Sequence, residues 1–187
     1  MIEYVEIATT GDAADFGDLT LARHTNQACS NATRAINFSG GSAPAGVSNV
    51  IDFFTMASTG NAQDFGDTLF EQRNGLGAMS SSTRAVLGGG FIDPAAINVI
   101  QYVEIATTGN AIDFGDLKNN SQHGNGTASA VRFVSMGGAS PSSPYSIDEV
   151  QYANFATGGT ALALGDLTAS GRWSGDAACS NAHGGLG

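Results

Sequence analysis

One twelve-residue phrase occurs four times in this chain, and its repetition constrains the fold more than any other feature of the sequence. It reads ATTGDAADFGDL from Ala8, ASTGNAQDFGDT from Ala57, ATTGNAIDFGDL from Ala106 and, in degenerate form, ATGGTALALGDL from Ala156. Successive copies begin 49, 49 and 50 residues apart. A period in the forties to fifty indicates one supersecondary unit per repeat, and four-stranded units that assemble into a β-propeller have this length.

The segments around each phrase predict four short strands per unit. An apolar run with partial alternation precedes each phrase: IEYVEIA at Ile2, VIDFFTMA at Val50, VIQYVEIA at Val99 and VQYANFA at Val150. After each phrase come small residues and then a short segment that closes on paired glycines: RAINFSGG at Arg34, RAVLGGG at Arg84, RFVSMGG at Arg132 and AHGGLG at Ala182. These patterns are typical of strands, and no helical period interrupts them. We therefore expect an all-β fold.

The phrase itself suits a turn followed by a packing residue. Its Thr-Gly-Asn or Thr-Gly-Asp start tolerates the left-handed backbone of a hairpin turn. The apolar residue of each copy is expected to pack between neighbouring units and to contribute about 1.5–3 kcal/mol each; these residues are Phe16, Phe65, Phe114 and Leu164. The next glycine lets the backbone bend. The second acidic residue can accept backbone hydrogen bonds, at Asp18, Asp67, Asp116 and Asp166.

The frame of the repeats predicts how the chain closes. Complete units are expected at about 28–76, 77–126 and 127–176, and a split unit combines 177–187 with 1–27. Strands from both chain ends would then share one unit, which closes the ring and removes exposed sheet edges. Alanines at 28, 78, 128 and 178 leave room for inner strands to approach a narrow axis. We therefore expect a single four-bladed ring and keep half of an eight-bladed dimer as the alternative.

With these features, the chain resembles kelch-type β-propellers. Paired glycines end the second strand, an aromatic strand follows, and Arg23 or Arg73 comes after the fourth strand, although the chain's one Trp, Trp173, leaves most units without the characteristic tryptophan. The words TTGNAIDFGDL and ACSNATRA resemble more narrowly the TTGNAxDFGDL repeat proteins of marine bacteriophages, cyanophages especially. This resemblance implies a virion structural protein or an appendage of the tail or capsid.

Composition narrows the partners and the location. The 187 residues carry 17 acidic and 7 basic side chains, a net charge of -10, and such a surface repels nucleic acid. The sequence opens on a strand-like segment without a secretory signal pattern, and no apolar run reaches the length of a membrane span. We expect a protein made in the host cytoplasm and carried in a virion, with other virion proteins as partners and no membrane insertion.

Acidic residues of the phrase are candidate calcium ligands because carboxylates at short spacing suit a hard cation. The candidates are Asp12, Asp15, Asp18, Asp64, Asp67, Asp113 and Asp116. In the fourth copy Ala163 replaces the Asp before the apolar residue, although Thr160 could still offer an oxygen ligand. Capping of turns is therefore the favoured role, and no cofactor is expected. The histidines, His24, His123 and His183, lack a short metal-binding spacing and are expected to make ordinary surface hydrogen bonds.

Three arginines, Arg34, Arg84 and Arg132, recur in register at the start of the second strand. Guanidinium groups at one level of a ring could line a pocket for a carboxylate or sulfate. The favoured interpretation is that each pairs with an Asp of its own or the adjacent unit. Cys29 and Cys179 occupy equivalent places. They can form a disulfide if their Cα atoms approach within about 7 Å, and buried free thiols are the favoured alternative.

No pattern in the sequence indicates an enzyme, since there is no nucleophile elbow, acid pair with a nearby His or phosphate-cradling loop. Two functions stay open. The first is a non-enzymatic bacteriophage structural protein, a capsid decoration or a tail or fibre appendage, acting by protein–protein docking. The alternative is an adhesin that binds a host-surface glycan or receptor through the loops that differ between units. Tyr145 and Trp173 could stack on sugar rings there.

Overall fold

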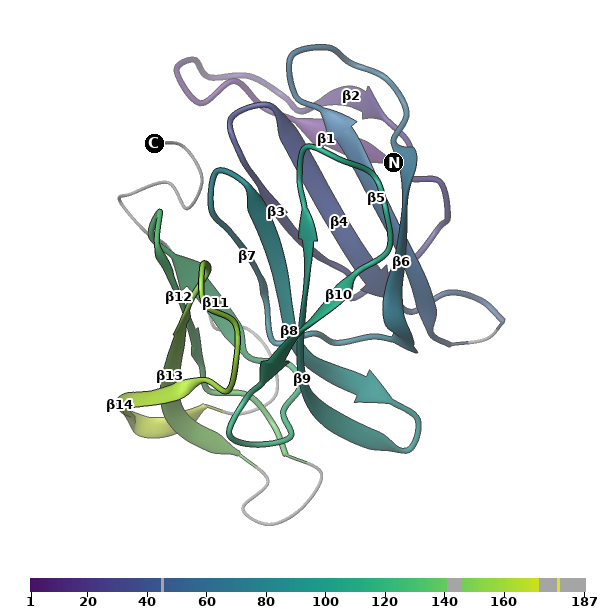
Figure 1. The fold of residues 1–187 in the computed structure, drawn as a ribbon. Helices are drawn as coiled ribbons and strands as arrows, with labels where there is room; N and C mark the ends of the chain where they lie inside the picture. Colours follow the sequence, from purple (N-terminus) through teal and green to yellow (C-terminus); the bar gives the residue numbers. More distant parts are fainter. Residues whose placement is uncertain (45, 141–145, 172–177, 179–187) are drawn as a thin grey trace.

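The computed structural model describes residues 1–44, 46–140, 146–171 and 178, and these form an all-β protein (Figure 1). Fourteen strands are arranged in four antiparallel sheets, and the described residues contain no helix. Consequently, no helix within these ranges is long and apolar enough to cross a membrane. The expectation of an all-β fold is confirmed.

Three of the sheets have four strands each, in simple sequential order. The first contains β3 (Gln27–Ser30), β4 (Arg34–Gly40), β5 (Ser48–Thr55) and β6 (Gln63–Gln72). The second contains β7 (Ala78–Ser80), β8 (Arg84–Ile92), β9 (Ala95–Glu104) and β10 (Ile112–Asp116). The third contains β11 (Asn125–Ala128), β12 (Arg132–Met136), β13 (Ile147–Asn154) and β14 (Leu162–Gly171). Each repeat thus folds into one sheet with the four strands that the sequence predicts.

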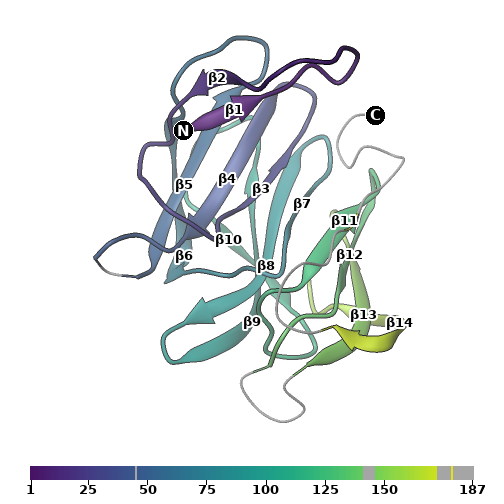
Figure 2. The same cartoon turned by 180° about the vertical axis from the view of Figure 1, so that it is seen from behind.

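The N-terminal sheet has only two strands, β1 (Ile2–Tyr4) and β2 (Ala14–Gly17). They correspond to the third and fourth strands of the other units, as the frame of the repeats predicts. Figures 1 and 2 show this short sheet beside β4 and β5. Phe16 on β2 packs on Phe54 on β5, with ring centroids 4.9 Å apart. Among the described residues, no sheet closes on itself and no fourth four-stranded sheet completes a ring.

The apolar core lies between neighbouring sheets. One cluster joins Phe53 and Phe65 of the first sheet to Leu87, Val103 and Ile105 of the second and to adjacent buried residues. A second cluster joins the second sheet to the third in the same way. The second sheet therefore buries one face against the first sheet and the other against the third, and the repeats depend on their neighbours for stability.

The innermost strands meet at a common axis. β7 contacts both β3 and β11. These strands line a cavity of about 340 Å³ formed by 27–30, 77–80, 125–128 and Ala178. Small side chains at the axis, as expected from the sequence, let the three strands approach one another. Ala178 brings the C-terminal part of the chain to the same cavity.

Candidate functional site

The repeated phrase forms the boundary between neighbouring sheets, and its aromatic residue is an inserted bulge. In the first complete unit Ile51 pairs with Gly66 and Asp52 pairs with Asp64, so Phe65 has no partner across the strand pair. The register shifts at the same phrase position in the other three copies. A bulge bends its strand and re-aims the extra side chain. The phrase recurs because every boundary uses the same bulge.

Backbone hydrogen bonds join each bulge to the turn of the following repeat. Phe65 O accepts from Gly109 N at 2.8 Å and Asp67 O accepts from Ala111 N at 2.8 Å. The boundaries on either side repeat both bonds. The turn also contributes a side chain, because Asp67 N donates to Asn110 Oδ1 at 3.1 Å. The Asn of the phrase therefore reaches back to the preceding repeat and does not serve only its own turn.

The glycine after the bulge is required by close approach of the next repeat. At Gly66, φ is +144°, and an added Cβ would lie 2.5 Å from the carbonyl oxygen of Gly109. Gly115 meets Gly159 O in the same way at 2.3 Å. Any larger residue would both strain the backbone and collide with the neighbouring main chain.

The aromatic residue of the bulge fills the space between sheets at three boundaries. Phe16, Phe65 and Phe114 are buried, and the Phe114 ring lies 5.5 Å from that of Phe133 in the following unit. The packing expected for these residues is confirmed. In the structure Leu164 does not pack in this way, and it is 54% exposed. The N-terminal sheet, which would be its neighbour in a ring, lies apart from β14 (Figures 1 and 2).

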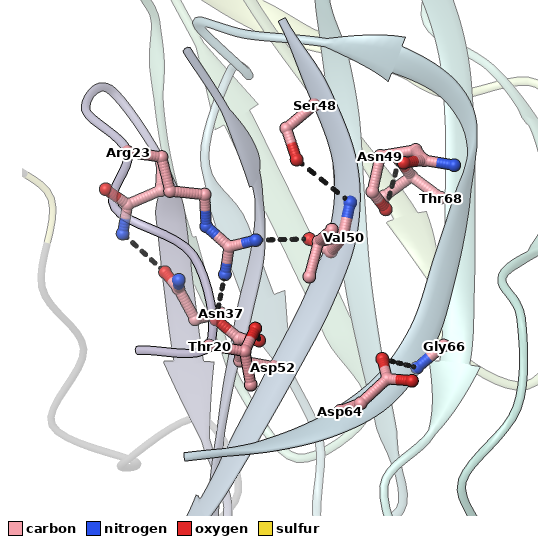
Figure 3. A network of polar contacts seen from close by, with 11 residues as sticks. Thr20, Arg23, Asn37, Ser48, Asn49, Val50, Asp52, Asp64, Gly66 and Thr68 are labelled. Carbon is pink, nitrogen blue, oxygen red and sulfur yellow. Dashed lines mark hydrogen bonds and ion pairs between the residues drawn. The ribbon is translucent and has the colours of Figure 1, made fainter. Parts of the chain in front are cut away.

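A buried ion pair crosses the first boundary (Figure 3). Arg23, after β2, forms an ion pair with Asp52 on β5 and donates to Val50 O at 3.0 Å; both charged side chains are fully buried. Thr20 Oγ1 also donates to the Asp52 carboxylate. Burial raises the pKa of Asp52, while the hydrogen bond from Thr20 and the charge of Arg23 oppose that rise.

Neutral amides occupy the same place at the next boundary. Gln101 Nε2 donates to Gln72 Oε1 at 3.1 Å, and Gln101 Oε1 accepts from Leu69 N at 2.8 Å. At the third boundary Gln151 accepts from Lys118 N at 2.9 Å. The structural counterpart of Arg23 is thus Gln72. This corrects the resemblance-based grouping of Arg23 with Arg73, because the 49-residue spacing of the phrases places Gln72, and not Arg73, at the position of Arg23.

Sequence reasoning missed these polar residues. A signal was available, since a polar residue recurs at one position of the otherwise apolar third strand, as Glu3, Asp52, Gln101 and Gln151. A buried polar side chain needs a partner. Its recurrence in register predicts a polar contact between units.

The three arginines do not converge on a shared pocket, and none lines the axial cavity. Arg34 Nη1 donates to Ile105 O at 2.9 Å in the following unit, and its guanidinium lies 4.8 Å from the Phe53 ring centre. Arg84 makes the same kind of bond to Phe155 O and forms an ion pair with Glu104 at 2.8 Å. Arg34 and Arg84 therefore join neighbouring units through carbonyl groups, whereas Glu104 lies in the same sheet as Arg84; neither arginine has the expected Asp as the partner of these bonds.

Arg132 repeats part of this pattern in the third unit. Its guanidinium lies 4.4 Å from the Tyr152 ring centre, and Nε donates to Asn154 Oδ1 at 3.4 Å. Among the described residues it has no bond to a carbonyl of a following unit.

The calcium candidates lie in the phrase turns and bulges. Asp64 Oδ1 accepts from Gly66 N at 3.2 Å, and Asp113 Oδ1 accepts from Gly115 N at 3.0 Å. Asp64 and Asp113 therefore cap their bulges, which confirms the capping role favoured for these two residues. Asp18 forms an ion pair with the N-terminal amine at 3.2 Å. Within the part of the chain that the structure describes, no three His, Cys, Asp or Glu residues gather as a metal site.

Other candidate residues fall partly outside the described ranges. Tyr145 and Trp173, the proposed sugar-stacking residues, lie there, and so do His183 and Cys179, so the disulfide is untested. Cys29 is a free thiol on the axial strand β3, and burial raises its pKa to about 12. His24 Nδ1 lies 3.3 Å from Thr25 Oγ1, an ordinary surface contact.

No protein-family model matches this chain, and no curated protein matches it. The geometry of the repeats therefore carries the functional argument.

Proposed function

We propose that this protein is a non-enzymatic structural component of a bacteriophage particle, a capsid decoration or a tail or fibre appendage that acts by docking on other virion proteins. Its frame in this proposal is a four-bladed, kelch-like propeller. The described sheets supply three blades, and the strands at the two chain ends share the fourth.

The observation that supports this proposal is how the repeated residues are used. The phrase residues at the three completed boundaries, Arg34, Arg84 and the buried amides contact a neighbouring repeat. The residues that recur thus build the scaffold. The segments that differ between units are left to interact with a partner, which is the division of labour expected of a docking module.

The variable connections share one end of the molecule. The β4–β5 and β8–β9 connections lie on the lower side in Figure 1, and the phrase turns lie at the opposite ends of their sheets. The tips of these connections, Pro44, Asp93 and Pro94, are exposed. Several loops on one end of a rigid frame can contact one partner surface together.

Incorporation into particles tests the proposal. A phage carrying this gene is purified, and the chain is sought in the particles by mass spectrometry. Its position is then located by comparing reconstructions of particles with and without it. We expect a stoichiometric virion protein whose variable loops face another virion protein. Absence from purified particles would contradict the proposal.

A matched pair of loop variants separates docking from folding. Changing Asp93 to Lys alters an exposed loop tip, whereas changing the exposed Gln63 to Lys alters the phrase end of a sheet. We expect both variants to fold and only the first to lose incorporation. If incorporation is unaffected but adsorption to host cells falls and isolated glycans bind the protein, the adhesin alternative replaces the structural role.

A further inference from the structure

A fourth boundary has all the parts of the other three, but its two halves are not in contact. One half is the phrase on β14, where Leu164 is 54% exposed. The other half is the N-terminal sheet, where Val5 is 57% and Ile7 is 99% exposed. The two halves lie apart in Figures 1 and 2.

The exposed apolar residues have buried counterparts at the completed boundaries. Ile105 and Phe155 occupy the position of Ile7 in later units and are 0% and 4% exposed. Val103, the counterpart of Val5, is also buried in the cluster that contains Phe65. Their counterparts in the second and third units are therefore covered, whereas Met56, which holds the position of Ile7 at the first boundary, is 38% exposed.

The backbone shows the same complementarity. At each completed boundary two backbone hydrogen bonds join the repeats. The glycine N–H of one turn donates to the carbonyl oxygen of the bulge residue, and the alanine N–H of that turn donates to the carbonyl oxygen of the Asp two residues after the bulge residue. The corresponding groups at the fourth boundary are Leu164 O and Asp166 O on one half and Gly11 N and Ala13 N on the other. Among the described residues these four groups have no such bond. In the same register, the Asp12 side chain would accept a hydrogen bond from Asp166 N, just as the Asn110 side chain accepts one from Asp67 N.

Arg132 supplies a further matching group. Arg34 and Arg84 each donate to the carbonyl of the Ile105 or Phe155 position in the next unit. The same geometry would aim Arg132 at Ile7 O. The β14 phrase and the N-terminal sheet are therefore complementary in one register. Their apolar residues, their backbone hydrogen-bonding groups and Arg132 would all find partners there.

We propose that the β14 phrase binds the β1–β2 sheet of the same chain, with Leu164 packed on Val5 and Ile7 and Arg132 bound to Ile7 O. This inference rests on the closed ring of the proposed function and specifies the contacts that close it. The occupant is the chain's own N-terminal sheet because Ala178 already lines the axial cavity with β3, β7 and β11. The segment from Ala178 reads ACSNA, identical to the inner-strand segment from Ala28.

Chemical cross-linking tests this register. Asp12 and Asp166 are both changed to Cys in a Cys29→Ser, Cys179→Ser background, and the folded protein is treated with a short bismaleimide at high dilution. The matched control carries Asn110→Cys and Asp67→Cys, whose backbone-to-side-chain hydrogen bond is 3.1 Å at a completed boundary. We expect both variants to cross-link within one chain with similar yield, seen as a monomer of altered mobility.

Other outcomes overturn the inference. A cross-link found only between two chains would show that a second copy covers the face. A cross-linked control with an unreacted Asp12–Asp166 variant would show that the boundary stays open. Neither result depends on particle incorporation, so failure of this closure is distinguishable from failure of the proposed function.

A double-variant measurement adds an independent readout. Ile7→Asp and Leu164→Asp are expected to lower the melting temperature singly, and the double variant should melt no lower than the worse single variant, because both remove one contact. Ile112→Asp on β10, 55% exposed in a completed repeat, is the surface control and should leave the melting temperature unchanged. Losses that add in the double variant, or single variants that melt like the native protein, would contradict the contact.

Discussion

The buried Arg23–Asp52 pair gives the sharpest prediction, because the next boundary carries an uncharged replacement. Changing both residues to Gln reproduces the pair formed by Gln72 and Gln101. Each single change leaves a buried charge without its partner, since both side chains are fully buried. We expect Arg23→Gln or Asp52→Gln alone to cost about 3–5 kcal/mol of unfolding free energy.

The double variant is expected to recover most of that loss. Replacing a buried ion pair by neutral side chains that fit is often neutral or stabilising. The double variant should therefore unfold within about 1 kcal/mol of the native protein or be more stable than it. Urea unfolding followed by circular dichroism measures all four proteins, with unchanged denaturant slopes as the check on two-state behaviour. A double variant that loses the sum of the two single losses would refute the reasoning.

The pH dependence of Arg23→Gln adds a second test. Burial raises the pKa of Asp52 above its ordinary 3.8, and removing Arg23 removes an interaction that opposes the rise. A carboxyl with a raised folded-state pKa contributes most stability below its unfolded pKa and loses that contribution as the pH rises through the folded value. The deficit of Arg23→Gln relative to the double variant should therefore be smallest near about pH 4 and grow toward about pH 7. A deficit independent of pH would contradict the assignment of the loss to the Asp52 charge.

Three further predictions concern the boundaries and the axis. Gly66→Ala should cost at least about 1–3 kcal/mol of unfolding free energy because of its positive φ and its collision with the next repeat. Gly88→Ala, whose added Cβ would lie 3.7–4.0 Å from its nearest neighbours, should stay within about 0.5 kcal/mol; equal losses in thermal or urea unfolding would contradict the close approach at Gly66. Phe114→Ala should cost about 3–5 kcal/mol of unfolding free energy. Ile112→Ala on the same strand should be nearly neutral because its side chain is exposed; a mild effect at Phe114 would show that its packing between the sheets is dispensable. Cys29, whose pKa burial raises to about 12, should react with iodoacetamide at about pH 8 much more slowly in the folded protein than in urea; peptide mapping measures this, and equal rates would contradict the raised pKa.

The repeats made the local fold predictable. Strand periodicity, glycine pairs and the fixed spacing of the phrase act over a few residues, so they are readable without knowledge of distant contacts. They predicted four strands per unit and the burial of Phe16, Phe65 and Phe114, which the structure confirms. They also suggested small residues at the axis, where Ala28 and Ala78 lie.

The partners across each boundary depended on tertiary structure. Arg34 binds a carbonyl 71 residues away, and Arg23 binds Asp52, 29 residues away, where the next boundary has Gln72 and Gln101. Leu164 shows the same limit, since its exposure depends on which surface covers it and not on its own pattern. The sequence by itself determined the repeating unit, because each unit's strands and turns follow from local chemistry. Only the tertiary structure decided which atoms join the units, because those contacts form between segments that the chain separates by whole repeats.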